Sequence, residues 1–481
     1  MKKIDFKNNM IARYTVTFIA FLFIFGSAFI GSIGDLGKSA VNVIGIFIGS
    51  LILWLTIGID WPSLLCIFAL GLVPEIGFNT VFSSSFGNTT YIFLLFTFIC
   101  TYALSQTPFV KRIAIWFVST KLAKKGPWYF ICSFFAAVIF VGCFMSPSVL
   151  FVVLLPILEE ILTIAKVEKG EKVGNMLMMG MAFTVSISSG MTTIAHVFPT
   201  LAMGALGGDI SHGSYMLMAI PVGIVITVLM ILIFRFILRP DVSKFDGIDI
   251  SSMKAELPKF SAKEGVCLSV FFAVVLLWIL PGILQNYLEF FKSIKKLGDA
   301  VPPLMGVLAL SVITVDKKPV VNITEAMKNG IPWAGMIMCA GTLALSSALT
   351  NNAIGIKAFL ESGLTEPLKN VSPILLLVLF VVWAGVQTNV SSNMVTATLV
   401  ATVASSVLSG VTGVNVTAVV CLIGMMASFA FATPPSMPHI AIATGSGWSD
   451  TKSMLVYGGL LLVVSVVIAC VVGYPLGVLL F

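Results

Sequence analysis

Long apolar stretches recur along the whole chain, and they are the feature that most restricts how it can fold. Each approaches the roughly 20 residues that a helix needs to cross a hydrocarbon layer of about 30 Å. The clearest cover residues 14–33, 41–57, 128–145, 216–234, 266–284, 373–384 with its flanks, and 454–481. With several shorter pieces, they predict an all-α polytopic membrane protein with about eleven transmembrane helices.

The amino-acid composition fits this class of protein. Hydrophobic residues make up 58% of the chain and charged residues only 10%, whereas about a quarter of the residues in soluble domains are charged. The first apolar stretch follows Lys2, Lys3, Lys7 and Arg13, as the core of a signal peptide would. Because similar stretches continue to the end of the chain, we expect a first transmembrane helix instead.

The charged residues predict how the chain is oriented. Lys and Arg exceed Asp and Glu by 28 to 21, which gives a formal net charge of +7. In a membrane protein such an excess indicates the positive-inside rule rather than nucleic-acid binding. Basic loops at 121–125, 166–172 and 235–244 therefore predict an inner (plasma) membrane protein with a cytoplasmic N-terminus. The eight cysteines are scattered singly, which is typical of small core residues.

Three features occur in the same order on both sides of a polar stretch at 241–264. An Ala-Leu-Ser step ends at Ser105 and again at Ser346, and a Ser-containing start to an apolar helix occurs at Ser146 and at Ser392. Breaks rich in Ser, Thr, Gly and Pro surround His196 and His439. The offsets are 241 (105 to 346), 246 (146 to 392) and 243 residues (196 to 439). This regularity predicts a duplication, which in transporters usually has inverted topology.

The duplication divides the chain into five parts. We expect N-terminal scaffold helices in 1–76, a first repeat with a hairpin, a motif helix and a broken helix in 77–240, a polar cytoplasmic linker in 241–264, scaffold helices in 265–315, and a second repeat with the same parts and a final helix in 316–481. Two apolar segments with polar centres, 78–105 and 323–349, are candidates for re-entrant hairpins, since irregular backbone inside a membrane must face protein or a water-filled cavity. The alternative is an ordinary helix with a few satisfied hydroxyls.

The residues at the duplicated helix starts resemble those of the divalent anion/sodium symporter family, the INDY-type di- and tricarboxylate transporters. That family carries a Ser-Asn-Thr motif at each of two hairpin-to-helix junctions. The second copy is similar to Ser392-Asn393-Met394, with Met in place of Thr. The first is similar to Ser146-Pro147-Ser148, where Pro stands for Asn and Ser for Thr. The Gly- and Pro-rich segments of the family resemble 182–204 and 428–447.

The resemblance implies a homodimer in which a transport domain moves as an elevator against a fixed scaffold. It implies a small dicarboxylate as cargo, such as malate, succinate, fumarate or 2-oxoglutarate. Sodium is the coupling ion in the family, but the altered motifs favour a sodium-independent exchanger, and sodium coupling stays open at this point. No metal and no other cofactor is expected.

A dicarboxylate brings two negative charges into the membrane, where an unpaired charge costs several kcal/mol. Helix N-termini with free amides, bound cations or basic side chains can compensate them. The motif residues are expected at helix N-termini, where hydroxyl and amide groups can donate hydrogen bonds to carboxylate oxygens. The predicted binding residues are therefore Ser146, Pro147, Ser148, Ser392, Asn393 and Met394. The alternative is that their polar members act only as N-caps.

Two of the three histidines occupy matching places in the halves, His196 and, after Pro438, His439. In the family these segments lie beside the sodium and substrate sites, so we add Pro438 and both histidines to the predicted site. Imidazole can be protonated near neutral pH, and such a pair would supply positive charge in place of sodium. An empty carrier with built-in charge would return poorly, which predicts obligate exchange. The alternative is two satisfied core residues.

Other functional classes lack sequence support or remain as rivals. The chain has no His-Glu-x-x-His, no Gly-x-Ser-x-Gly and no phosphate-binding loop pattern, so we do not expect an enzyme. A sodium- or proton-coupled symporter of di- or tricarboxylates or sulfate would share the same fold. An anion channel would use the same polar breaks to line a pore.

Overall fold

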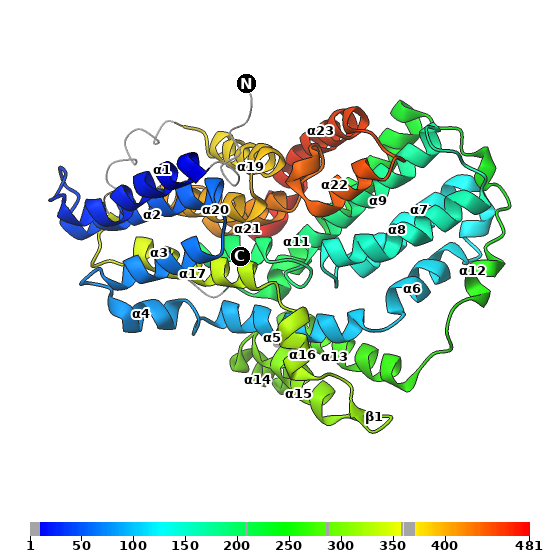
Figure 1. Ribbon diagram of the computed structural model, residues 1–481, viewed down its shortest axis with the longest axis horizontal. Helices are drawn as coiled ribbons and strands as arrows, with labels where there is room; N and C mark the ends of the chain where they lie inside the picture. Colours follow the sequence, from blue (N-terminus) through cyan, green and yellow to red (C-terminus); the bar gives the residue numbers. More distant parts are fainter. Residues whose placement is uncertain (1–9, 207–209, 285–287, 357–358, 360–370) are drawn as a thin grey trace.

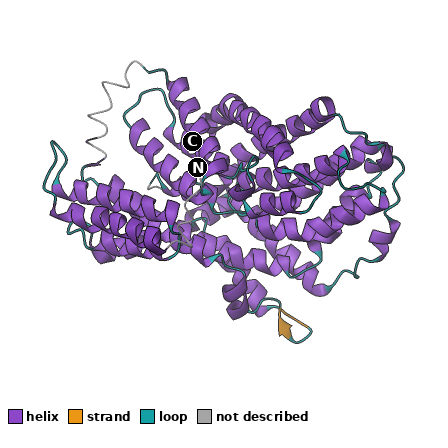
Figure 2. Ribbon diagram, turned by 45° about the horizontal axis from the view of Figure 1, so that its top comes forward, coloured by secondary structure: helices purple, strands orange, loops and turns teal. Residues whose placement is uncertain are grey.

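The protein is an all-α membrane protein, as the apolar pattern predicted. A computed structural model describes residues 10–206, 210–284, 288–356, 359 and 371–481. Within these residues the regular structure is helical except for β1 (Thr314–Val315) and β2 (Lys318–Pro319), which form a two-stranded antiparallel ribbon. Figures 1 and 2 show the helices and this single ribbon at one edge.

The helices before the polar linker belong to the first half of the chain. They are α1 (Met10–Phe21), α2 (Lys38–Thr56), α3 (Trp61–Gly71), α4 (Gly77–Ser84), α5 (Thr89–Ser105), α6 (Phe109–Val118), α7 (Pro127–Gly142), α8 (Pro147–Ile164), α9 (Lys172–Met191), α10 (Phe198–Gly204) and α11 (His212–Ile233). Short irregular turns extend two of them: α1 continues to Phe29 and α11 to Leu238.

The linker and the second half hold the remaining helices. They are α12 (Ser251–Ala255), α13 (Ala262–Leu284), α14 (Glu289–Leu297), α15 (Val301–Val312), α16 (Ile323–Asn329), α17 (Trp333–Thr350), α19 (Pro373–Val390), α20 (Asn393–Leu408), α21 (Val416–Ala427), α22 (Pro438–Gly445), α23 (Thr451–Ile468) and α24 (Tyr474–Leu480).

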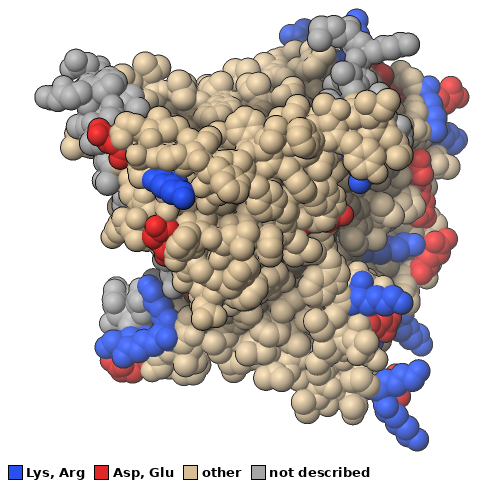
Figure 3. All heavy atoms as spheres, turned by 60° about the vertical axis from the view of Figure 1, so that its left-hand side comes forward, with Lys and Arg blue, Asp and Glu red and all other residues tan. Residues whose placement is uncertain are grey.

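Among the described residues, seven helices are long and apolar enough to cross a membrane, and an eighth if α4 and α5 form one bent span. Five further apolar helices, α3, α7, α15, α20 and α21, have only 10–17 residues. About eleven full spans were expected, so the described residues contain fewer helices of spanning length than predicted, and the five shorter apolar helices are too short to cross a membrane alone. Figure 3 shows a broad face almost without charged side chains, with charges gathered at its edges. Such a face suits contact with lipid tails.

The two expected hairpins at 78–105 and 323–349 do not form there. Helices α4 and α5 meet at a bend of 41°, so the chain turns aside without reversing. In the second segment, α16 has seven residues and carries Glu325 and Lys328, which keeps it at a polar surface. The chain reverses instead at the two motifs: four residues, 143–146, join α7 to α8, and two residues, Ser391 and Ser392, join α19 to α20. Each pair is in contact.

The short helices of each half pack against the hairpin of the other half. Helix α10 lies against α20 and α21, and α22 lies against α8 and α9. Helix α9 is buried along nearly its whole length, because it is surrounded by elements of both halves. This reciprocal packing is the arrangement expected of two related halves, and it brings both motifs to the centre of the molecule.

An ion pair fixes the connection between α5 and the first hairpin. Arg112 on α6 donates from Nε and Nη2 to the carboxylate oxygens of Glu264, at 2.8 and 3.0 Å, and from Nη2 to the Pro258 carbonyl at 2.9 Å. The Glu264 side chain, in the first turn of α13, is fully buried. The bidentate geometry satisfies both carboxylate oxygens, so α6 is held against the end of the linker.

Candidate functional site

A cavity of about 530 Å³ lies where the tip of the first hairpin meets the helix break of its own half. Its size would hold a small organic anion. Five segments contribute to its wall: the C-terminal part of α5, the tip before α8, the break before α10, the loop between α16 and α17, and the start of α20. The lining residues are Phe98, Thr101, Tyr102, Ser105, Gln106, Met145, Ser146, Val149, Ala195, His196, Val197, Asn329, Gly330, Ile331, Pro332 and Met394.

The polar groups of this cavity are neutral hydroxyl, amide and imidazole groups. Its lining contains no Lys, Arg, Asp or Glu. A bound anion would therefore meet no fixed carboxylate, and its negative charge would be balanced by hydrogen-bond donors and helix dipoles. Small-molecule sites typically combine a mainly apolar wall with a small number of polar groups that face the ligand.

Ser146 occupies the N-cap position of α8 without capping it. Its backbone has φ −55° and ψ 132°, Pro147 follows at the first helical position, and the side chain makes no capping hydrogen bond. Pro147 lacks an N–H, but the amides that follow it in the first turn still point out of the helix end. The start of α8 thus offers a hydroxyl and uncapped amides at the cavity, which is a suitable arrangement for a carboxylate.

The first hairpin tip is joined closely to the break after α9. Thr192 donates from its hydroxyl to the Cys143 carbonyl at 2.6 Å. A Cβ on Gly142 would lie 2.0 Å from the Ser188 hydroxyl oxygen, so only glycine allows this approach of α7 to α9. The Thr192 bond occupies a carbonyl that would otherwise be unsatisfied at the end of α7.

The second hairpin tip is held by Asn389, whose side chain is almost completely buried. Its Oδ1 accepts hydrogen bonds from the amides of Phe431 and Ala432, both at 2.8 Å, and its Nδ2 donates to the carbonyls of Gly385 and Phe429 at 2.8 and 3.0 Å. One side chain therefore satisfies the irregular backbone after α21. Such backbone needs partners inside a membrane because no water is available there.

Two neighbouring side chains converge on the end of α21. The hydroxyl of Thr388 donates to the Ala427 carbonyl at 2.6 Å, and Nδ2 of Asn393 donates to the same oxygen at 3.1 Å. Ser392 accepts a hydrogen bond from the Val395 amide at 3.5 Å and caps α20. At the second motif, the N-cap alternative therefore describes Ser392, while Asn393 fastens the hairpin to α21.

The two histidines have different surroundings. His196 lines the cavity, its Nδ1 accepts a hydrogen bond from the Val197 amide at 3.0 Å, and its ring lies 3.8 Å from that of Phe198. A neutral His196 in this arrangement carries its proton on Nε2. An Nε2–H group is then available to donate to an anion.

His439 lies inside the protein and does not line the cavity. Its side chain is fully buried, and Nε2 is 2.8 Å from the hydroxyl of Ser186, which itself donates to the Ala430 carbonyl at 3.1 Å. The hydroxyl therefore accepts from Nε2–H, while Nδ1 has no partner of normal geometry among the described residues. His439 connects α22 to α9 across the two halves, so the structure brings one histidine rather than two to the cavity.

The structure thus separates the predicted binding residues into three groups. Ser146, His196 and Met394 line the cavity. Pro147, Ser148, Ser392 and Asn393 belong to the same hairpin junctions but not to the lining. Pro438 and His439 begin α22, which lies against α8 and α9; Pro438 is exposed and His439 is buried.

The sequence analysis missed the wall provided by α5. Thr101, Tyr102, Ser105 and Gln106 all line the cavity, together with Asn329. Thr101, Tyr102 and Ser105 of α5 and its C-cap Gln106 recur at spacings of one, three and four, which places them on one side of a helix. Polar residues grouped on one side of an otherwise apolar helix were the available signal.

A metal site is not evident in the described part of the chain, which contains no group of three or more His, Cys, Asp or Glu side chains close enough to bind an ion. All eight cysteines are free, and most are buried. They behave as small core residues, as their scattered positions indicated.

Comparison with known proteins agrees with this arrangement. The chain is similar to the sodium-dependent dicarboxylate transporter SdcS of Staphylococcus saprophyticus, with 24% identity over 457 residues, which cover 89% of this chain and 86% of that protein. It is also similar to uncharacterized transporters of Haemophilus influenzae (23% identity; 73% of this chain, 74% of that one) and Methanocaldococcus jannaschii (25%; 70% and 72%). A family model described as citrate transporter matches residues 46–426. The chain therefore belongs to the citrate transporter family, in agreement with its predicted resemblance to the divalent anion/sodium symporters.

Proposed function

We propose that this membrane transporter carries small dicarboxylates of the malate, succinate, fumarate and 2-oxoglutarate class, by exchange of one anion for another. The observation that carries the proposal is the uncapped N-terminus of α8, which meets His196 in a cavity without charged side chains. A dianion gains hydrogen bonds there and meets no repelling carboxylate. The name of the SdcS relative supports the same class of cargo.

Exchange is supported by the way in which the two hairpin junctions are closed. A sodium ion bound there would need oxygen ligands. The Cys143 and Ala427 carbonyls already accept hydrogen bonds from Thr192, Thr388 and Asn393. The two donors on Ala427 use both lone pairs of its carbonyl oxygen, and Thr192 uses one of the two on Cys143. The positive end of α8 also persists when the cargo leaves, and an empty carrier with this uncompensated site would return slowly.

Elevator motion and a homodimer belong to the same proposal. The two hairpins and the short helices α10 and α22 are interlocked by contacts between the halves, as parts that move together would be.

The domain division at 77, 241, 265 and 316 and the cytoplasmic N-terminus follow from the repeat and the basic loops. The C-terminal end of α5 leads into α6, which is bound to the linker. The cavity beside that end would then face the cytoplasm.

The test is uptake of labelled succinate into proteoliposomes with and without internal succinate. Exchange predicts uptake many times faster into loaded vesicles, with no dependence on external sodium. Equal uptake into empty and loaded vesicles would contradict exchange. A strict sodium requirement would favour the symporter, for which the name of the SdcS relative is the specific support. Flux that does not saturate and shows no counterflow would indicate an anion channel.

A further inference from the structure

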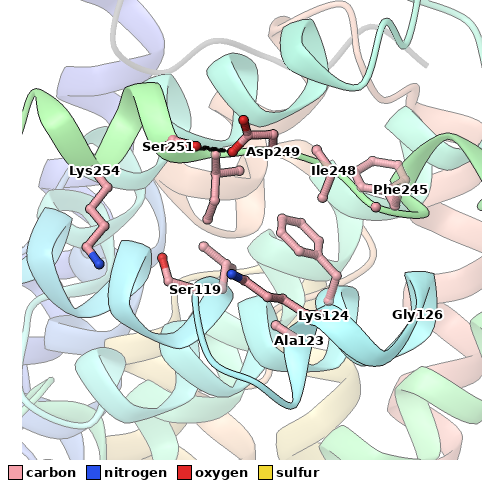
Figure 4. A pocket seen from close by; sticks show the side chains of 13 residues that line it. Ser119, Ala123, Lys124, Gly126, Phe245, Ile248, Asp249, Ser251 and Lys254 are labelled. Carbon is pink, nitrogen blue, oxygen red and sulfur yellow. Dashed lines mark hydrogen bonds between the residues drawn. The ribbon is translucent and has the colours of Figure 1, made fainter.

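A second cavity, outside the transport site, lies between the polar linker and the junction of α6 with α7. Its volume is about 470 Å³, and two separate segments line it. One contributes Val118, Ser119, Ala123, Lys124, Gly126 and Phe130, and the other contributes Phe245, Gly247, Ile248, Asp249, Ile250, Ser251 and Lys254. Figure 4 shows this cavity from close by.

The linker is fixed in place by apolar side chains, so the cavity is preformed. Phe245, Ile250 and Met253 are buried, and the ring of Phe245 lies 5.8 Å from that of Phe130. Burying large apolar side chains stabilises the contact between the segments that carry them. Three such anchors hold the linker against α6 and α7 on both sides of the cavity.

Two lysines extend into this cavity without ion-pair partners. The ammonium groups of Lys124 and Lys254 both point into the gap, with the Ser119 hydroxyl between them (Figure 4). Neither lysine forms a salt bridge with any described residue. A preformed pocket in which two ammonium groups and a hydroxyl donor outnumber a single carboxylate has the chemistry of an anion site.

Asp249 is the one carboxylate in the lining, and it accepts hydrogen bonds from a neighbouring residue of the linker. It accepts hydrogen bonds from the amide of Ser251, at 3.0 Å, and from the Ser251 hydroxyl. The hydrogen bond from the Ser251 hydroxyl has the larger effect and that from the amide the smaller, and both lower the pKa of Asp249. The carboxylate is therefore ionised at neutral pH. With Lys124 and Lys254 the lining still has one net positive charge.

Exposed residues around the cavity place it at the level of lipid headgroups. Trp116 on α6 is 60% exposed and Tyr129 on α7 is 50% exposed, and Leu122 between them is 52% exposed. Trp and Tyr side chains are enriched where a membrane meets water. Basic pockets at such a level on the cytoplasmic side suit anionic lipid headgroups.

We propose that Lys124, Lys254 and Ser119 bind the phosphate of an anionic membrane lipid in the cavity between the linker and the junction of α6 with α7. A phosphate there bridges the two segments that line the cavity. The lipid therefore holds the linker against α6, next to the ion pair of Arg112 with Glu264. This site does not depend on which cargo the protein carries.

The test compares phosphatidylglycerol with phosphatidylcholine as additives to the full chain in neutral detergent. Native mass spectrometry counts bound lipids, and thermal unfolding measures stabilisation. The wild-type chain should bind phosphatidylglycerol in preference to phosphatidylcholine. The double variant K124Q/K254Q should bind it about 30-fold more weakly, equivalent to roughly 1 kcal/mol per lysine.

A matched control replaces two exposed lysines that do not line the cavity, as K172Q/K452Q, and should keep the wild-type preference. The variant Ser119→Trp fills the cavity without changing its charge and should also lose the bound lipid. Retention of the lipid by both K124Q/K254Q and Ser119→Trp would overturn the proposal. Equal stabilisation by millimolar inorganic phosphate would overturn its lipid part and leave a site for soluble phosphate.

Discussion

Replacing Asn389 by Ala should destabilise the protein strongly, because this side chain satisfies the irregular backbone after α21. The substitution removes four hydrogen bonds and leaves the Phe429 carbonyl and the amides of Phe431 and Ala432 without partners. Each buried backbone group left unsatisfied costs about 1 to 3 kcal/mol. If local rearrangement recovers part of that cost, three groups lower the free energy of unfolding by about 3 to 6 kcal/mol.

The assay is equilibrium unfolding in mixed detergent micelles, with Gln387→Ala as the matched control. Gln387 lies on the same helix, is half-buried and accepts one hydrogen bond, from Nε1 of Trp383 at 2.7 Å. Its loss should cost about 1 kcal/mol. A free energy of unfolding for Asn389→Ala within about 1 kcal/mol of the wild type would refute the claim that Asn389 holds this segment.

Three further perturbations test other parts of the account. Ser146→Ala should weaken succinate binding about 10-fold or more, since a hydrogen bond to a charged group contributes about 1.5 to 3 kcal/mol; isothermal titration measures it. Ser392→Ala should instead lower stability by about 1 kcal/mol, because Ser392 caps α20, and unchanged thermal unfolding would contradict that role. Glu264→Gln should cost about 1 to 3 kcal/mol by removing the carboxylate that accepts two hydrogen bonds from the partly exposed guanidinium of Arg112, and wild-type resistance of α6 to proteolysis would contradict it.

The pH dependence of stability provides a fourth test, at the cytoplasmic loops. A hydrogen bond from Lys244, at 2.6 Å, lowers the pKa of Glu171 below its ordinary value of 4.5. The pair therefore stabilises the folded state above that ordinary value, and its contribution is lost as the pH falls through the lowered pKa. Lys244→Gln should reduce the loss of stability on acidification, measured by thermal unfolding between pH 7 and pH 3. An unchanged acid response would show that the pair contributes nothing.

The sequence predicts the fold class well because lipid tolerates few solutions. Apolar stretches of spanning length require helices, and the two Ser-containing motifs do begin α8 and α20. The hairpins were placed wrongly for a physical reason. The segment 143–146 where α7 reverses is mainly apolar, whereas the polar residues around Ser83 accompany only a bend. Periodicity and polarity do not distinguish a reversal from a kink.

The candidate site was predictable in part. Ser146 was proposed from the motif resemblance and His196 from the matched positions of two histidines, and both line the cavity. The burial of His439 was not predictable, since its partner Ser186 lies 253 positions away in the sequence. The α5 wall was missed because Thr101 and Ser105 resemble ordinary hydroxyls that bond back to their own helix, which both also do. Only the packing of α5 beside the first hairpin gives them a place at the cavity.

The most direct test of the central claim is a cryo-electron microscopy map of the protein at saturating succinate. Our account predicts density for a dianion beside the Ser146 hydroxyl and the first-turn amides of α8, within hydrogen-bond distance of His196. A well-resolved map in which this cavity is empty, or in which succinate occupies another part of the protein, would contradict it.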